Sequence, residues 1–336
     1  MGQLMRMWNV VLQEHKEAQK RHLSYRVPRT ATLSHHLRLI EAPMEHTSLE
    51  EVLSRHWRER NQPSDHAIMV VYKARLDEAM KLKSGVALDD AKRRRDIFDM
   101  VRRQLIGSEV LSRYVQAVFP DHTAYWLFRK RFTAQLALFS LATHVLSLSK
   151  GQPHTFRFTL GSGDIIPWEC QPMLNAEGRL DSSRQARDGQ ARDGQDGGQD
   201  GGQDGQGVQG HVPFRLTPNL VNFVTPSGIT GVFSGSMVAA AQALMQPEGH
   251  VSALLGAVLR DETLSWHAQH RPPHHAGAMP SAELLACLGE STATAKERLV
   301  ELATFAGNFK PVDGLIKEAT ASSNLCAMPS LWQPWL

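Results

Sequence analysis

Apolar residues recur every three or four positions along much of this chain. In the first segment they are Leu4, Met7, Trp8, Val11 and Leu12. This spacing predicts an amphipathic helix over residues 3–22. A chain that opens in a helix, with no strand-rich start, is expected to be a fragment of a longer protein.

Helical patterns dominate between residues 65 and 148. They occur in HAIMVVYKARLDEAMKL, ALDDAKRRRDIFDMVRRQL, SEVLSRYVQAVF and DHTAYWLFRKRFTAQLALFSLATHVLSL. The last of these is apolar nearly all round from Ala134 to Leu148, which is typical of a buried central helix. Before them, Thr47 and Glu50 have the spacing of a capping box, and they predict a helix start.

Short strands are predicted in two regions. Two β-type runs lie around Val27 and over Leu37–Ile40, and TFRFTLGSGDIIPWE has the pattern of a β-hairpin that turns at Gly161–Gly163. We interpret Asp164 as a solvated residue of this turn. Further helices are predicted in SGSMVAAAQALM and HVSALLGAVLRDETLSWHAQ, and two or three more in SAELLACLGE, ATAKERLVELATFA and GLIKEATASSNLC.

A tract of Gly, Gln and Asp repeats interrupts these patterns. RQARDGQARDGQDGGQDGGQDGQGVQG cannot bury enough apolar surface to offset its ordering entropy, so we predict a disordered insertion. Elsewhere apolar residues are plentiful, and at 42% of 336 residues they suffice for a large core. The sequence therefore predicts a mostly α-helical fold with a few short strands.

Composition narrows the functional classes. A net charge of +3 is too balanced to indicate nucleic-acid binding, and three widely spaced cysteines provide neither a disulfide framework nor zinc-ligand spacing. Four histidines crowd a proline-rich segment, where nothing fixes metal geometry, so no metal site is expected; they are His267, His270, His274 and His275. No apolar run reaches the roughly 18 residues of a membrane span.

The end of the chain is strongly apolar. NLCAMPSLWQPWL contains Trp332, Trp335 and Leu336, whereas chain ends are usually polar and fray. Two interpretations stay open. The tail packs on its own domain, or it contacts a partner or a membrane.

This ending resembles the FATC element of the phosphatidylinositol-3-kinase-related kinases. KRHLSYRVPR, LRLIE, TAYWLFRKRFTAQLAL, VPFRLTPNL and VLRDETLSWH resemble the kinase-like region of that family, in the same order. The resemblance covers the chain apart from the Gly/Gln/Asp tract and the segment near His270. It implies the mostly α-helical C-lobe of a PI3/PI4-kinase-like fold, closed by a helical FATC tail. It also implies exposed apolar surface on the first helix, where an N-lobe would pack.

Composition and resemblance together divide the chain. The expected parts are an N-lobe remnant with hinge strands (1–42), the first part of the C-lobe (43–174), the disordered insertion at the position of the activation segment (175–211), the second part of the C-lobe (212–268), a linker (269–280), further helices (281–303) and the FATC element (304–336).

The family's catalytic positions carry unsuitable residues here. The loop reads GDRHxxN in active relatives, and in this register its Asp falls on Lys150, its His on Gln152 and its Asn on Thr155. The later metal-binding Asp falls on Glu169. Lys150 is a cation that can neither accept a proton at neutral pH nor bind Mg²⁺. Gln152 has no titratable proton, and Thr155 is a weak, neutral metal ligand. Since such groups act as a unit, we predict no catalysis and no cofactor.

The resemblance therefore implies a pseudokinase that acts as a scaffold. It implies a subunit of nuclear histone-acetyltransferase coactivator complexes of the SAGA type, with transcription activators bound through the longer protein. Neither direct nucleic-acid nor membrane contact is expected, and Trp332, Trp335 and Leu336 are the candidate partner-binding residues. The alternative is an atypical serine/threonine kinase, in which Glu169 holds Mg²⁺ and Lys150 stabilises phosphate charge.

Overall fold

The computed structural model describes most of the chain. The described residues are 1–34, 37–41, 45–59, 65–81, 87–148, 152–167, 170–180, 212–224, 229–246, 248–270, 281–304, 309–328 and 332–336. Within them the fold is mostly helical with a few short strands, as the sequence predicts. Most of the predicted insertion (175–211) and of the predicted linker (269–280) lies outside the described residues.

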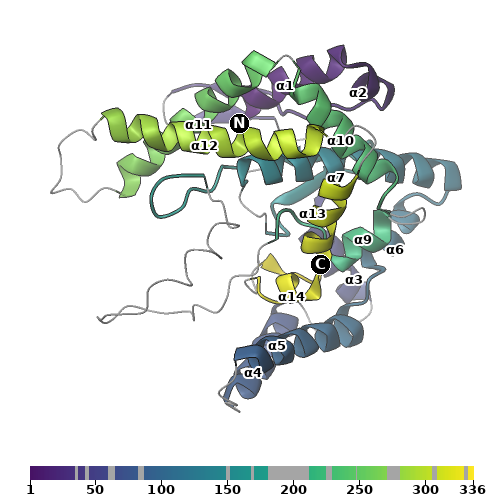
Figure 1. Cartoon of the computed structure of the whole chain (residues 1–336). Coiled ribbons are helices and arrows are strands. Elements are labelled where there is room, and N and C mark those ends of the chain that lie inside the picture. Colours follow the sequence, from purple (N-terminus) through teal and green to yellow (C-terminus); the bar gives the residue numbers. More distant parts are fainter. Residues whose placement is uncertain are drawn as a thin grey trace, which may run out of the picture.

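Helix α7 (His122–Leu146) forms the centre of the molecule (Figure 1). The Asp121 carboxylate accepts a hydrogen bond from the backbone N–H of Ala124 at its start, and Ser147 ends it in the left-handed conformation. From Phe132 onward nearly every side chain is buried, because α10 (Val232–Leu244) and α12 (Ser281–Ala303) pack against it. The predicted central helix is confirmed.

The first predicted helix is divided in two. Helices α1 (Gly2–Glu14) and α2 (Lys16–Lys20) are separated at His15, whose backbone is extended and whose Nδ1 accepts a hydrogen bond from the N–H of Ala18. Helix α1 packs on α10 through its buried residues, which are Leu4, Met5, Trp8 and Leu12. Met7 and Val10 face solvent, so the exposed apolar surface predicted on this helix is confirmed.

Two small antiparallel sheets flank the helices. Strand β1 (Thr30–Thr32) pairs with β2 (Arg38–Ile40), so the first strand lies after Pro28 and not around Val27 as predicted. The second sheet joins β3 (His46–Ser48), β4 (Phe156–Thr159) and β5 (Ile165–Pro167). Its β4–β5 pair is the predicted hairpin. Its β3–β4 pair connects segments more than a hundred residues apart in sequence.

The predicted capping box is displaced by one residue. Helix α3 (Leu49–Glu59) follows β3 directly. Ser48 Oγ accepts from the Glu51 N–H at 3.1 Å, and Glu51 Oε2 accepts from the Ser48 N–H at 2.9 Å. The Thr47–Glu50 assignment is therefore wrong, because Ser48 directly precedes the helix and exchanges both hydrogen bonds with Glu51.

The remaining helices complete the fold. They are α4 (Asp65–Lys81), α5 (Ala87–Val101), the π-helix η1 (Arg102–Ile106), α6 (Val110–Val118), α9 (Pro218–Val224), α11 (Glu248–His270), α13 (Lys310–Thr320) and α14 (Ser322–Leu325). Helices α4 and α5 pair at the lower end of Figure 1, and α11 packs along α12 at the upper end. Helix α12 is continuous where SAELLACLGE and ATAKERLVELATFA suggested two helices. In the described part of the chain, no helix combines the length and the apolarity needed to cross a bilayer.

Candidate functional site

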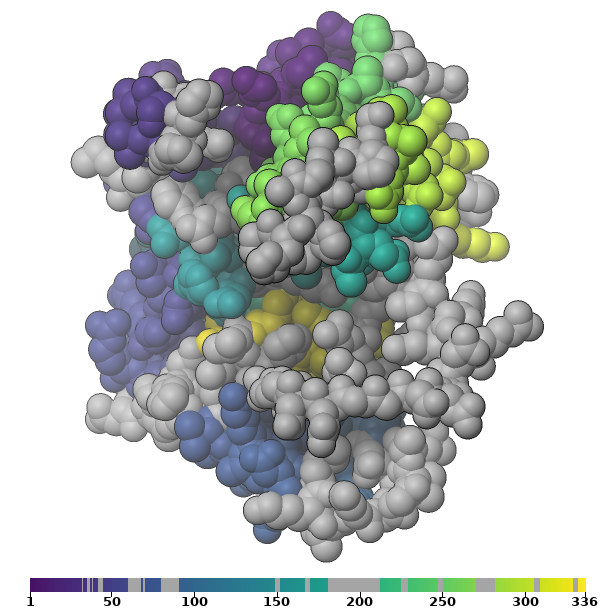
Figure 2. Space-filling view, turned by 90° about the vertical axis from the view of Figure 1, so that its left-hand side faces the viewer, coloured from purple at the N-terminus to yellow at the C-terminus, as the bar shows by residue number. Residues whose placement is uncertain are grey.

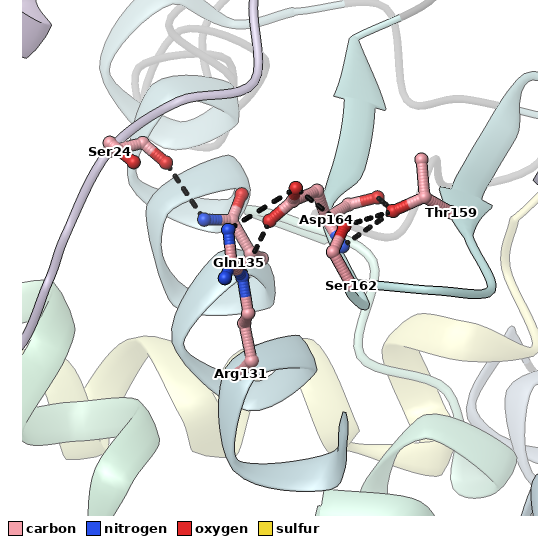
Figure 3. Close-up of polar contacts among 6 residues, drawn as sticks. All are labelled: Ser24, Arg131, Gln135, Thr159, Ser162 and Asp164. Atoms are coloured by element: carbon pink, nitrogen blue, oxygen red, sulfur yellow. Dashed lines mark hydrogen bonds and ion pairs between the residues drawn. The ribbon is translucent and has the colours of Figure 1, made fainter. Parts of the chain in front are cut away.

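The β4–β5 hairpin is fixed to α7 by a polar network around Asp164 (Figure 3). Arg131 Nε donates to Asp164 Oδ1 at 2.9 Å, and Ser162 Oγ donates to Asp164 Oδ2 at 2.6 Å. Asp164 is buried, so its interpretation as a solvated turn residue is wrong. Because a buried carboxylate needs partners, the network fixes both the turn and the face of α7 beside it.

Removing this carboxylate tests the network. The change Asp164→Ala is expected to lower the free energy of unfolding by about 1–2 kcal/mol, since it removes one hydrogen-bond partner of the Ser162 hydroxyl and breaks an ion pair that is half exposed. Urea denaturation measures the loss. Glu59→Ala, which breaks the exposed Arg55–Glu59 pair, is the matched control and should cost less than about 0.5 kcal/mol. Equal losses in the two variants would contradict a structural role for the network.

The predicted degenerate loop begins where α7 ends. Ser147 accepts a backbone hydrogen bond from Met173, and Arg298 of α12 donates to the carbonyl of His144 at 2.9 Å and to Ser147 Oγ at 2.7 Å. Further along the chain, Thr155 Oγ1 donates to the carbonyl of Gln152 at 2.8 Å. Two of the four positions predicted to correspond to catalytic residues therefore lie in one local turn. Lys150 and Glu169 lie outside the described residues, and the assignment of all four positions stays a prediction.

The segment after the hairpin packs against α11 and α12. Gly178 has a φ of +76°, and a Cβ there would come within 2.8 Å of His267 Nε2. The N–H of Leu180 donates to Ser291 Oγ, and Arg179 pairs with Glu290 of α12. Among the residues that the structure describes, no group of three or more His, Cys, Asp or Glu side chains gathers as a metal site would require.

A second polar centre lies at the carboxy-terminal tail. Arg215, in the segment VPFRLTPNL, is buried and donates to the backbone oxygens of Trp332 (2.8 Å), Gln333 (3.0 Å) and Leu336 (2.8 Å). Its guanidinium also lies 4.3 Å from the centre of the Trp332 ring. Burial lowers the pKa of Arg215 to about 9, which leaves the side chain a cation at neutral pH. We call this arrangement the tail socket.

Asn219 and Tyr72 complete the tail socket. Asn219 Nδ2 donates to the carbonyls of Trp335 (3.2 Å) and Gly107 (3.1 Å), and its Oδ1 accepts from the N–H of Val110. The Tyr72 ring meets Trp335 edge to face at 5.2 Å between centroids, and its hydroxyl donates to the carbonyl of Cys326. The tail is thus bound to α4 through Tyr72, to α9 through Asn219, and to the segment before α9 through Arg215. In Figure 2 yellow residues of the carboxy-terminal region lie recessed above the blue α4–α5 pair.

The three predicted partner-binding side chains are inside this socket. Trp332, Trp335 and Leu336 are buried by their own chain, in agreement with the interpretation that the tail packs on its own domain. Contact of these side chains with a partner stays a prediction, and it would require the tail to leave the socket. Arg215 and Asn219 were not predicted as site residues. The signal available was the presence of three polar side chains, Arg215, Thr217 and Asn219, in an otherwise apolar segment.

The fold and the tail of this chain each match a known protein or domain. Residues 311–336, inside the range predicted for it, match the FATC domain. The solved FAT and kinase domain of CtTel1 superposes with a TM-score of 0.67 at 19% identity, covering 100% of this chain and 20% of that one. The chain therefore has the fold of the matching part of that FAT and kinase domain, and it includes a FATC domain.

Sequence relatives narrow the class further. The chain is 31% identical over 343 residues to the transformation/transcription domain-associated proteins of Danio rerio and Homo sapiens. It is 26% identical over 350 residues to the SAGA complex/NuA4 acetyltransferase complex subunit Tra1 of Schizosaccharomyces pombe. Each match covers 99% of this chain and only 8% or 9% of the relative. The chain is thus homologous, over almost its whole length, to a short part of these large proteins.

Proposed function

We propose that this chain is the catalytically inactive, kinase-like region of a scaffold subunit in a histone-acetyltransferase coactivator complex. The names of the relatives support membership of a SAGA- or NuA4-type assembly. The observation that carries the scaffold role is the tail socket, in which Arg215 joins the FATC domain to the kinase-like core. Because the tail is bound to the core, the kinase-like region would be rigid and would offer fixed surfaces to neighbouring subunits.

The absence of catalysis is the second part of the proposal. In the proposed register, Gln152 stands for the catalytic His and Thr155 for a metal-binding Asn, and neither can act as a base at neutral pH. The hydroxyl of Thr155 is used in a local hydrogen bond to Gln152. These features support a pseudokinase.

The proposal extends to partners and location. The subunits of the acetyltransferase complex would dock on this region, whereas transcription activators would bind through other parts of a longer protein. The protein would act in the nucleus, without direct contact to nucleic acid or membrane. The expected parts, with their boundaries at 42, 174, 211, 268, 280 and 303, remain part of this proposal.

Nucleotide binding tests the inactive state. Calorimetric titration of Mg²⁺-ATP into the folded chain, and into the longest soluble form of the protein, is expected to give no heat at millimolar ATP. Circular dichroism verifies that each sample is folded. Micromolar binding that Glu169→Gln abolishes would overturn the proposal and favour the atypical kinase.

A further inference from the structure

The segment of residues 23–29, which precedes β1, is held against helix α1. Asn9 of α1 binds it at Tyr25, because Asn9 Nδ2 donates to the Tyr25 carbonyl at 2.9 Å and Asn9 Oδ1 accepts from the Tyr25 N–H at 2.6 Å. The Tyr25 side chain is buried, and its hydroxyl donates to the carbonyl of Leu138 in α7. The backbone of this segment is therefore fixed by two helices.

Three exposed arginines lie where this segment meets α1. Arg6 Nη2 of α1 is 3.5 Å from the carbonyl oxygen of Pro28, which places the guanidinium beside the backbone of Arg29. Arg26 follows the buried Tyr25 in an extended backbone, so its side chain points the opposite way, toward solvent. We call Arg6, Arg26 and Arg29 the basic cluster.

The positive charge of the chain is concentrated in this region. Residues 1–34 contain six Lys or Arg and two Glu, a net charge of +4, although the whole chain carries only +3. Glu17 is ion-paired within α2, and Glu14 lies roughly 12 Å along the axis of α1 from the cluster. Glu41 accepts from the backbone N–H of Arg29 at 3.1 Å. With Glu41 counted, the three arginines still leave a net charge of +2. Among the described residues, no carboxylate is ion-paired with a guanidinium of the basic cluster.

Exposed apolar side chains lie beside the basic cluster and indicate the class of its partner. Met7 and Val10 are 47% and 55% exposed, and both lie within about one turn of Arg6 on α1. A protein segment can cover such side chains, whereas a phosphate backbone offers them no apolar contact. The rest of the chain has a net charge of −1, so a long polyanion would gain little further attraction. A short acidic protein segment therefore fits this surface better than nucleic acid.

We propose that the basic cluster docks an acidic segment of a neighbouring protein subunit, whose carboxylates bind the three guanidiniums while an apolar side chain covers Met7 and Val10. The planar guanidinium suits this role because it binds a carboxylate through two parallel hydrogen bonds. Since the backbone that carries Arg26 and Arg29 is already fixed, docking costs little ordering of the chain. The inference deepens the scaffold function proposed above and rests on it, since it specifies one surface on which a neighbouring subunit binds.

Fluorescence polarisation with the full 336-residue chain tests the basic cluster. The probe is a fluorescein-labelled peptide of about 12 residues in which Glu alternates with Ser around a central Leu. We expect saturable binding that weakens as salt is raised. Arg26→Glu is expected to weaken it about tenfold, and Arg26→Lys, which keeps the charge, to retain most of it. Arg103→Glu is the matched control and should leave the affinity unchanged. It alters another exposed arginine, in η1 next to α5, at the opposite end of the molecule from α1 (Figure 1).

Several results would overturn this docking proposal. Equal affinity of the wild-type chain and Arg26→Glu is one, and equal binding of a peptide with Gln in place of Glu is another. Preference for a DNA duplex or for phosphatidylserine vesicles over the peptide overturns it in favour of nucleic acid or membrane. Loss of peptide binding in the longest soluble form of the protein would show that other parts of the protein cover the cluster.

Co-purification of acetyltransferase subunits with the longer protein is the separate test of the scaffold. If those subunits bind while the peptide does not, the docking proposal alone fails. If the peptide binds while no acetyltransferase subunit co-purifies, the scaffold function fails, and with it the assignment of the acidic segment to a neighbouring subunit.

Discussion

Replacing Arg215 by leucine is expected to lower the free energy of unfolding by about 3–5 kcal/mol. The guanidinium is buried and is a shared donor to three backbone oxygens of the tail, those of Trp332, Gln333 and Leu336. Leucine has a side chain of sufficient size to fill part of the space but donates no hydrogen bond. The three oxygens would be left buried without this donor, and each such group costs roughly 1–3 kcal/mol.

Guanidinium chloride denaturation measures this effect, and two variants sharpen it. Arg113→Leu removes an exposed arginine that pairs with Glu109, and it should cost less than about 1 kcal/mol. Arg215→Lys should recover part of the loss, since an ammonium retains the charge but lacks the planar fork that reaches separate oxygens. If Arg215→Leu and Arg113→Leu were equally stable, the tail socket would not be an important source of stability.

Truncating Trp335 to alanine is expected to cost about 3–5 kcal/mol as well. The indole is fully buried and packs edge to face on Tyr72. Its removal leaves a cavity that the backbone contacts of the tail prevent from closing, since Asn219 still binds the carbonyl of residue 335. Thermal unfolding followed by circular dichroism measures the loss.

The exposed Trp126 is the matched control for this experiment. Trp126→Ala removes an equally large side chain from the surface and should change stability by less than about 0.5 kcal/mol. The opposite pattern, with a stable Trp335→Ala protein that loses a binding partner, would contradict the socket. It would support the alternative in which the tail contacts a partner.

Periodicity was sufficient to predict the elements whose environment is uniform. Helix α7 is buried along most of its length, so its apolar run identifies it without further information. The β4–β5 hairpin likewise follows from alternation around Gly161–Gly163. Elements defined by one local atom pair were less predictable. At the break, the His15 ring nitrogen accepts a hydrogen bond from the N–H of Ala18, and at the start of α3, Ser48 and Glu51 exchange hydrogen bonds.

The site residues also differ in how far the sequence could predict them. Trp332 and Trp335 were identified because aromatic side chains are unusual at a chain end. Arg215 could not be assigned a role from its neighbours, because its acceptors lie 117 to 121 positions further along the chain. Asp164 was misjudged for the same reason. A carboxylate next to glycines is usually solvated, and its partner Arg131 comes from a different element, 33 positions away.

The long sequence separations in the tail socket have a consequence for protein synthesis. Tyr72 and its acceptor at Cys326 are 254 positions apart, so the ribosome makes nearly the whole described core before this contact can form. Until the tail emerges, Arg215 lacks these acceptors and cannot remain buried without cost, and the ring of Tyr72 lacks the Trp335 indole that packs on it. A chain that lacks residues 332–336 is therefore expected to expose apolar surface and to aggregate more readily than a chain that has them.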